Sequence, residues 1–219
     1  MKVIIFGINQ TAQLAHYYLT TDSDYDVVAF SANEKYIEDM KEFCGLPLIP
    51  FEDIEQSHSV DEYRFFAPMT YRNMNNDRKD IYYKIKEKGY ELISYVSSMA
   101  TVFDNVKIGE NCFILEDNTI QPFVTIGNNV VLWSGNHIGH HGTIKDHVFL
   151  TSQVVISGNC VLGENSFFGV NATIRDFMKI GKYSFIGMGC IIVTDTDDYS
   201  VYFPNTSPKK ELSSLKLKL

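Results

Sequence analysis

The sequence has no basic excess, no long apolar run and only four cysteines. Its 219 residues hold 19 Lys and Arg against 27 Asp and Glu, which gives a formal net charge of −8. Because nucleic-acid binding needs clustered cations to meet the phosphates, this balance argues against a nucleic-acid-binding protein. The apolar run in the first ten residues is too short for a signal peptide or a membrane span, so we expect a cytoplasmic protein.

A hexapeptide period organises the second half of the chain. A large apolar residue returns at every sixth position, a smaller residue commonly follows four positions later, and glycine often follows directly. This period fits neither a helix nor an isolated strand, but it fits a coil with three short sides. Coils of about 18 residues would stack like residues, which predicts a parallel β-solenoid of about five coils. The repeated residues are Val102, Ile108, Ile114, Ile120, Ile126, Leu132, Ile138, Ile144, Leu150, Ile156, Leu162, Phe168, Ile174, Ile180, Ile186 and Ile192.

The small inward position of this repeat includes most of the cysteines. Cys112, Cys160 and Cys190 all occupy it, so we expect buried free thiols rather than disulfides or metal ligands. Asn118 and Asn136 occupy the same position one coil apart. We expect their amides to bond to each other and to the nearby backbone.

An α/β unit precedes the repeat. Residues 2–6 and 25–30 are expected strands around a helix at 11–19, followed by a strand at 64–68, a helix at 76–88 and a strand at 90–96. The turn at residues 7–12 keeps only the first glycine of a Rossmann-type phosphate-binding turn. A nucleotide site and a turn that binds nothing therefore both remain open. We expect one domain at residues 1–97 and the solenoid at 98–219, with the tail at 212–219 capping its open end.

Four of the six histidines fall on one coil: His137, His140, His141 and His147. Outward positions of a solenoid do not require histidine, so the group indicates a site. Stacking of the coils would place His140 beside the backbone N–H of Gly158. A base next to a hydrogen-bond donor for an oxyanion is the pairing that acyl transfer needs. A solvated histidine patch is the alternative.

These features together resemble the sugar acyltransferases typified by the sialic acid O-acetyltransferase and the bacillosamine-pathway acetyltransferase. The resemblance lies in the domain order, the hexapeptide frame, the transition segment at residues 94–102 and the coil at residues 133–144, where a histidine follows an aliphatic residue by two. It implies a left-handed β-helix after a Rossmann-like domain. It also implies a homotrimer, with acetyl-CoA between neighbouring β-helices and a nucleotide-linked sugar on the N-terminal domain.

The resemblance also implies roles for individual residues. By position, His140 is the catalytic base, Gly158 holds the oxyanion, and His141 stands where the family has an acidic residue. The group that tunes His140 is thus open, with Asp146 as an alternative. The implied coenzyme contacts are Phe149, Gly158, Val170 and Met188. The implied nucleotide-sugar contacts are Gln10, Thr11, Ala12, Ala32 and Asn33.

We therefore expect an acetyl-CoA-dependent acetyltransferase without a metal, acting on the amino group of a nucleotide-linked amino deoxysugar for a surface polysaccharide such as lipopolysaccharide. Acetylation of a sugar hydroxyl is one alternative. A zinc hydratase of the β-helix carbonic anhydrase type is another, because such enzymes bind metal through histidines across a trimer interface. A trimeric adaptor without activity is the third.

Overall fold

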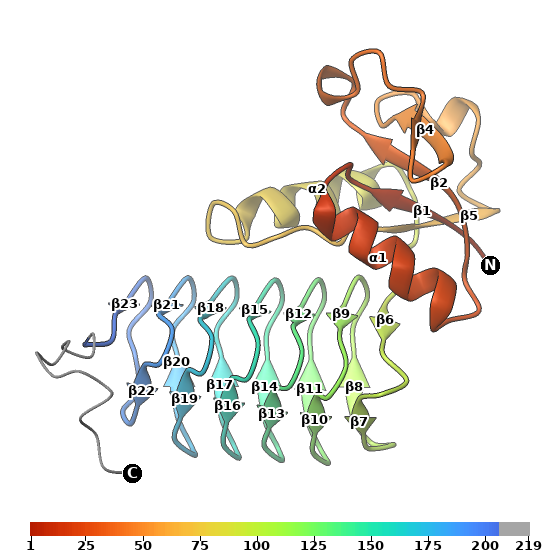
Figure 1. Cartoon of the computed structure of the whole chain (residues 1–219). Coiled ribbons are helices and arrows are strands. Elements are labelled where there is room, and N and C mark those ends of the chain that lie inside the picture. The colour runs from red at the N-terminus through yellow and green to blue at the C-terminus, as the bar shows by residue number, and fades with distance from the viewer. Residues whose placement is uncertain (206–219) are drawn as a thin grey trace, which may run out of the picture.

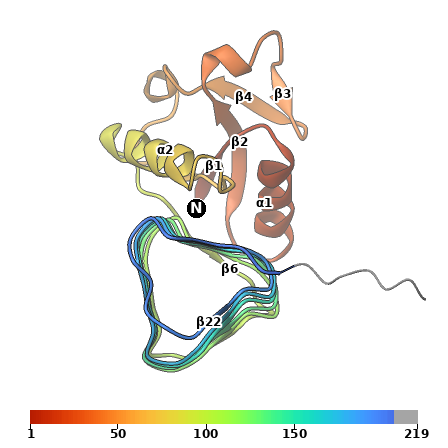
Figure 2. The same cartoon turned by 90° about the vertical axis from the view of Figure 1, so that its left-hand side faces the viewer.

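The computed structural model describes residues 1–205, and the expected cap at residues 212–219 lies outside them. An α/β unit rests along one side of a triangular prism of β-coils (Figures 1 and 2). Neither helix in residues 1–205 is long and apolar enough to cross a lipid bilayer.

The N-terminal unit is a five-stranded sheet with one helix on each face. The sheet order is β3-β4-β2-β1-β5, and β3 alone is antiparallel to its neighbour. Alternate residues of β1 point to opposite faces, so Val3 and Ile5 pack with α1, whereas Ile4 and Phe6 pack with α2. The elements are β1 (Lys2–Phe6), α1 (Gln10–Thr21), β2 (Asp26–Ala32), η1 (Glu34–Tyr36), β3 (Glu42–Phe43), β4 (Leu46–Pro50), η2 (Ile54–Gln56), β5 (Tyr63–Phe66) and α2 (Asn76–Glu87).

The strand expected at residues 90–96 is largely absent. Leu92 forms only an isolated bridge with Phe65, and β6 (Tyr95–Val96) pairs with β9 of the β-helix. Stacking of coils therefore begins at Tyr95. The division into domains at residues 1–97 and 98–219 stays a prediction.

The β-helix has three parallel sheets of two-residue strands. The first sheet holds β7 (Thr101–Val102), β10 (Thr119–Ile120), β13 (His137–Ile138), β16 (Val155–Ile156), β19 (Thr173–Ile174) and β22 (Ile191–Ile192). The second holds β8 (Lys107–Ile108), β11 (Thr125–Ile126), β14 (Thr143–Ile144), β17 (Val161–Leu162) and β20 (Lys179–Ile180). The third holds β6, β9 (Phe113–Ile114), β12 (Val131–Leu132), β15 (Phe149–Leu150), β18 (Phe167–Phe168), β21 (Phe185–Ile186) and β23 (Val201–Tyr202).

The repeat register predicted from the sequence is confirmed. Ile120 pairs with Ile138 and Ile138 with Ile156, so like residues stack from coil to coil. From Ile114 to Ile192 the repeated residues are all buried in one core cluster, and the half-buried Val102 and Ile108 pack against its end. Each fully buried aliphatic side chain contributes about 1.5–3 kcal/mol relative to an exposed one.

The buried free thiols are confirmed. The amides of Asn118 and Asn136 bond to the backbone as expected, but they do not bond to each other. Cys112, Cys160 and Cys190 are buried and free. The Nδ2 atom of Asn118 donates to the carbonyl oxygen of Trp133 over 2.9 Å, and Nδ2 of Asn136 donates to the same oxygen. The two amides thus share a backbone carbonyl acceptor and do not bond to each other.

The N-terminal unit sits on the third sheet. Phe113 and Phe149 of that sheet share a core cluster with Phe66 of β5 and Leu19 of α1, and Trp133 packs against its edge. This contact fixes which sides of the triangular prism are covered. The other two sheets face away from the N-terminal unit (Figure 2).

Candidate active site

The turns that join the first sheet to the second form what we call the histidine corner, which includes residues 139–142 and 157–160. His140 and Gly158 occupy equivalent places there in successive coils. A Cβ atom added to Gly158 would lie 2.9 Å from both Cε1 and Nε2 of His140. The imidazole therefore lies against the bare Cα of Gly158, and any larger residue at position 158 would displace it. The sequence spacing correctly predicted this pairing.

His140 and His141 contact each other. Their Nδ1 atoms are 3.0 Å apart, and both side chains are exposed. The backbone N–H of His140 donates to Oε1 of Gln121 over 2.9 Å. The ring of His141 lies over the ring of Phe123, with centroids 4.6 Å apart and planes tilted by 33°. The neighbour that orients His140 is thus a second imidazole.

Asp146 does not lie at the histidine corner. Its Oδ1 atom accepts a hydrogen bond of 2.7 Å from the backbone N–H of Asn128, at the turns that join the second sheet to the third. We call these turns the docking corner, because α2 packs on them. The structure therefore removes Asp146 as the group that tunes His140.

The prediction that four histidines form one group is wrong, because His147 lies at a different corner from His140 and His141. It is buried at the docking corner, where its ring centroid lies 5.5 Å from that of Tyr82 and 5.6 Å from that of Tyr83 of α2. Burial and the nearby guanidinium of Arg78 lower the pKa of His147 to about 4. The Arg78 guanidinium donates to the backbone carbonyl oxygens of Asn129 and His147, which anchors α2 to the β-helix. His147 is a structural residue, and His137 is half-buried on β13.

The four implied coenzyme contacts lie in three places. Gly158 is at the histidine corner, whereas Val170 and Met188 lie at the turns that join the third sheet to the first, where their side chains are 40% and 67% exposed. Phe149 is 1% exposed, because Tyr71 and Phe167 cover it beneath the N-terminal unit. A coenzyme contact at Phe149 does not fit this structure.

Two adjoining cavities of about 560 and 600 Å³ open at the carboxyl ends of β1 and β2. Gln10 and Thr11 line the first cavity, and Ala32 and Asn33 line the second. Ala12 is buried in the core, and its backbone N–H donates to the capping oxygen of Asn9 over 3.0 Å. The structure therefore brings four of the five implied contacts to the cavities and leaves Ala12 out.

Sequence reasoning missed the basic residues of the second cavity. Lys35, Arg72 and Lys84 all line it, together with Asp77 and Asp80. Arg72 is paired with Asp77 across 3.3 Å. A signal was present, because positions 77, 80 and 84 lie on one face of a helix.

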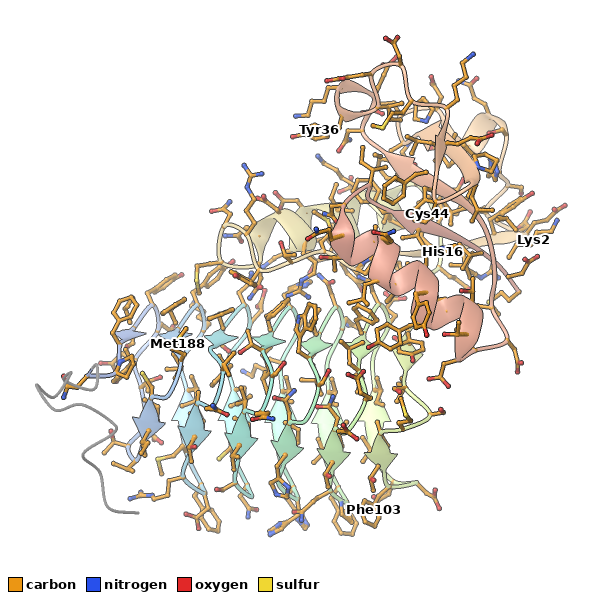
Figure 3. All side chains as sticks on the ribbon, viewed as in Figure 1. Lys2, His16, Tyr36, Cys44, Phe103 and Met188 are labelled. Carbon is orange, nitrogen blue, oxygen red and sulfur yellow. The ribbon has the colours of Figure 1, made fainter. Side chains whose placement is uncertain are left out.

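The histidine corner and the cavities lie on opposite sides of one chain. Phe103, which holds the same corner as His140 two coils earlier, lies at the edge of the β-helix farthest from Tyr36, a residue of the second cavity (Figure 3). The N-terminal unit covers the third sheet, and the histidine corner is the opposite vertex of the triangle (Figure 2). A ligand in the cavities of one chain would therefore lie on the side of that chain away from its own His140.

Comparisons with known proteins agree with this architecture. Residues 105–140 match the family model described as bacterial transferase hexapeptide (six repeats). Comparison with curated protein sequences gives no significant match.

Several solved structures share the fold over most of their length. PerB from Caulobacter crescentus, in complex with CoA and GDP-perosamine, is 20% identical with a TM-score of 0.80 over 92% of this chain and 93% of its own. The acetyltransferase domain of PglB from Neisseria gonorrhoeae, in complex with acetyl coenzyme A, is 20% identical with a TM-score of 0.78 over 91% and 94%. WeeI from Acinetobacter baumannii is 17% identical with a TM-score of 0.76 over 92% and 96%.

The chain therefore has the architecture of these proteins, a Rossmann-like α/β unit followed by a left-handed parallel β-helix, and its residues 105–140 carry the hexapeptide repeat of the bacterial transferases.

Proposed function

We propose that the protein is an acetyltransferase that moves the acetyl group of acetyl-CoA to the amino group of a nucleotide-linked amino deoxysugar. The observation that carries this proposal is the contact between the His140 imidazole and the bare Cα of Gly158. This contact holds a base and a backbone N–H at one point on the surface. The solved structures of the same fold, in complex with CoA, acetyl coenzyme A or GDP-perosamine, support it.

The proposed chemistry uses the two groups in sequence. Nε2 of His140 takes a proton as the amine attacks the thioester carbonyl, and the backbone N–H of Gly158 stabilises the oxyanion that forms. Within residues 1–205 this N–H donates no hydrogen bond of its own. The tetrahedral intermediate then collapses, and the thiolate of CoA leaves with the proton from His140. A general base of this kind supplies roughly 10² to 10⁴ in rate.

The position of the two regions supports a site shared between chains. Since the cavities and the histidine corner lie on opposite sides of a chain, the sugar bound by one subunit would meet His140 of another. We propose a homotrimer, in which the β-helices pack side by side and acetyl-CoA lies between them. The exposed side chains of Val170 and Met188 would then contact the coenzyme across the interface.

The cavities suit a nucleoside diphosphate. Three basic residues outnumber the two aspartates that line the second cavity, and the start of α1 supplies the N–H groups of Gln10 and Thr11. Asn33, held by Oε1 of Glu52 over 3.1 Å, would lie against the nucleoside. This arrangement supports a nucleotide handle on the acceptor sugar.

A screen of nucleotide-linked amino sugars with acetyl-CoA tests the proposal, read by release of free thiol and by the mass of the product. An added acetyl mass on the amine is expected, and His140→Ala is the matched control. Modification of a hydroxyl instead would support the O-acetyltransferase. A protein that binds no acetyl-CoA in calorimetry would be a trimeric adaptor, and stoichiometric zinc with bicarbonate formation would indicate the hydratase.

A further inference from the structure

A pair of imidazoles occupies the histidine corner. The Nδ1 atoms of His140 and His141 are 3.0 Å apart, so one ring must donate and the other accept. Among the interactions of residues 1–205, neither ring has a carboxylate partner within hydrogen-bond or ion-pair distance. The orienting group of His140 is therefore itself able to take up a proton.

The second ring of the pair has an aromatic support. Phe123 presents its ring to His141 at 4.6 Å and remains 58% exposed. Its backbone φ of 67° lies in the left-handed region, which is unfavourable for a bulky residue. Position 123 lies 18 residues before position 141, so coil stacking sets the phenyl ring directly against the imidazole of His141. An aromatic face attracts a cation, and an imidazolium on this face would be stabilised.

We propose that His141 is a positioning residue and proton relay for His140, and that Phe123 stabilises the charge of the pair. The inference rests on the proposed acetyl transfer. In the resting state Nδ1–H of His140 donates to Nδ1 of His141, which leaves Nε2 of His140 free beside Gly158 to accept a proton.

One proton moves along the pair in each half of the reaction. When the substrate amine gives a proton to Nε2 of His140, the Nδ1 proton of His140 moves to Nδ1 of His141, which becomes an imidazolium on the ring of Phe123. The proton returns by the same path when the CoA thiolate leaves. No other co-reactant is needed.

The tautomer of His140 tests the pair without any substrate. With ¹⁵N-labelled histidine, NMR at a pH where both rings are neutral reports which ring nitrogen carries the proton. We expect the Nδ1–H form for His140 in the wild-type trimer and the Nε2–H form in His141→Gly. Glycine is the chosen replacement because position 141 has a φ of 57°. Finding Nε2–H at His140 in the wild type, or no change in the variant, overturns the inference and leaves the proposed function intact.

Kinetics test the same roles during turnover. His141→Gly should lower kcat about tenfold at unchanged KM for acetyl-CoA, the effect of losing one hydrogen bond to a charged group. His141→Glu should restore most of it, since a carboxylate also accepts from Nδ1–H. A kcat unchanged in His141→Gly would overturn the positioning role, whereas failure of the wild type on every amino sugar would count against the proposed function.

A matched pair of variants isolates the aromatic support. Phe123→Leu should lower kcat roughly two- to fivefold, as expected for an exposed cation–aromatic contact. Phe177→Leu is the control, because Phe177 has a similar φ of 62°, is 65% exposed and lies on the same corner two coils from His141. Equal effects of the two substitutions would remove the charge-stabilising role of Phe123.

Discussion

At the scale of single residues, the proposed proton transfer depends on the nitrogen atoms of His140. His140→Ala should lower kcat by about 10² or more with little change in KM for acetyl-CoA, because the substitution removes proton transfer and leaves the binding surfaces in place. Steady-state kinetics of the wild type and the variant check this. A loss that appears only in KM for the sugar would make His140 a binding residue instead.

The free energy of unfolding should depend on pH through His147. The folded-state pKa of His147 is about 4, below the usual value near 6.5 in unfolded chains. Between these values the unfolded state binds more protons, so stability is full near neutral pH and falls as the pH drops from about 6.5 to 4. At about 1.4 kcal/mol per pKa unit, the loss is on the order of 3 kcal/mol.

The hydrogen bonds of the docking corner also predict that protonation of His147 destabilises the folded state. The backbone N–H of Ala67 donates to Oδ1 of Asn111, so Nδ2 of Asn111 donates to Asn129, and Nδ2 of Asn129 is left to donate to Nδ1 of His147. Protonation of that Nδ1 would leave two hydrogen-bond donors, Nδ2 of Asn129 and Nδ1 of His147, facing each other. His147→Gln should therefore flatten the slope of unfolding free energy against pH between 6.5 and 5, measured by denaturant titration. A slope equal to that of the wild type would contradict the assignment.

At the scale of elements, the stacked repeat should not accept a charge on its inward positions. Ile156 of β16 is 1% exposed, and Ile156→Asp would bury an unpaired carboxylate, so we expect loss of cooperative unfolding. Val155 on the same strand is 38% exposed, and Val155→Asp is the matched control with nearly unchanged melting. Calorimetry or circular dichroism checks both. Equal tolerance of the two substitutions would mean that the inward register is wrong.

The repeat could be predicted from the sequence because its period alone determines which side chains point inward. Ile120, Ile138 and Ile156 needed no tertiary information to be placed. The corners were harder, because all three have the same hexapeptide spacing. Nothing in that spacing shows that α2 covers the corner of His147 and leaves the corner of His140 open. The position of α2 depends on Arg78 and its two carbonyl acceptors, which only the folded chain brings together.

At the site, too, contacts set by the repeat could be predicted, whereas contacts set by the packing of the N-terminal unit could not. The contact between His140 and Gly158 follows from coil stacking and was predicted correctly. Phe149 was misplaced as a coenzyme contact because the packing of the N-terminal unit on the third sheet cannot be read from a local motif. Lys35, Arg72 and Lys84 come from three separate segments, and only the tertiary fold joins them.

At the scale of the whole molecule, the proposed site exists only in an assembly. We expect a monomer to be inactive, because the cavities proposed to hold the acceptor lie on the side of a chain away from its own His140. We expect light scattering to show a trimer at micromolar concentration, with subunits related by a cyclic axis. A monomer with full transferase activity would contradict both the assembly and the site.

Complementation between two inactive variants tests whether His140 of one chain acts on a sugar held by another. One variant is His140→Ala, and the other carries Arg72→Glu and Lys84→Glu in the second cavity. The two chains are coexpressed with different tags, and trimers that carry both tags are purified.

We expect each variant alone to be inactive and the mixed trimers to recover acetyl transfer. Sites that combine an intact cavity from one chain with an intact His140 from its neighbour occur once in each mixed trimer, so about a third of the wild-type rate is expected. Mixed trimers as inactive as the separate variants, despite an active wild type, would contradict a site shared between chains.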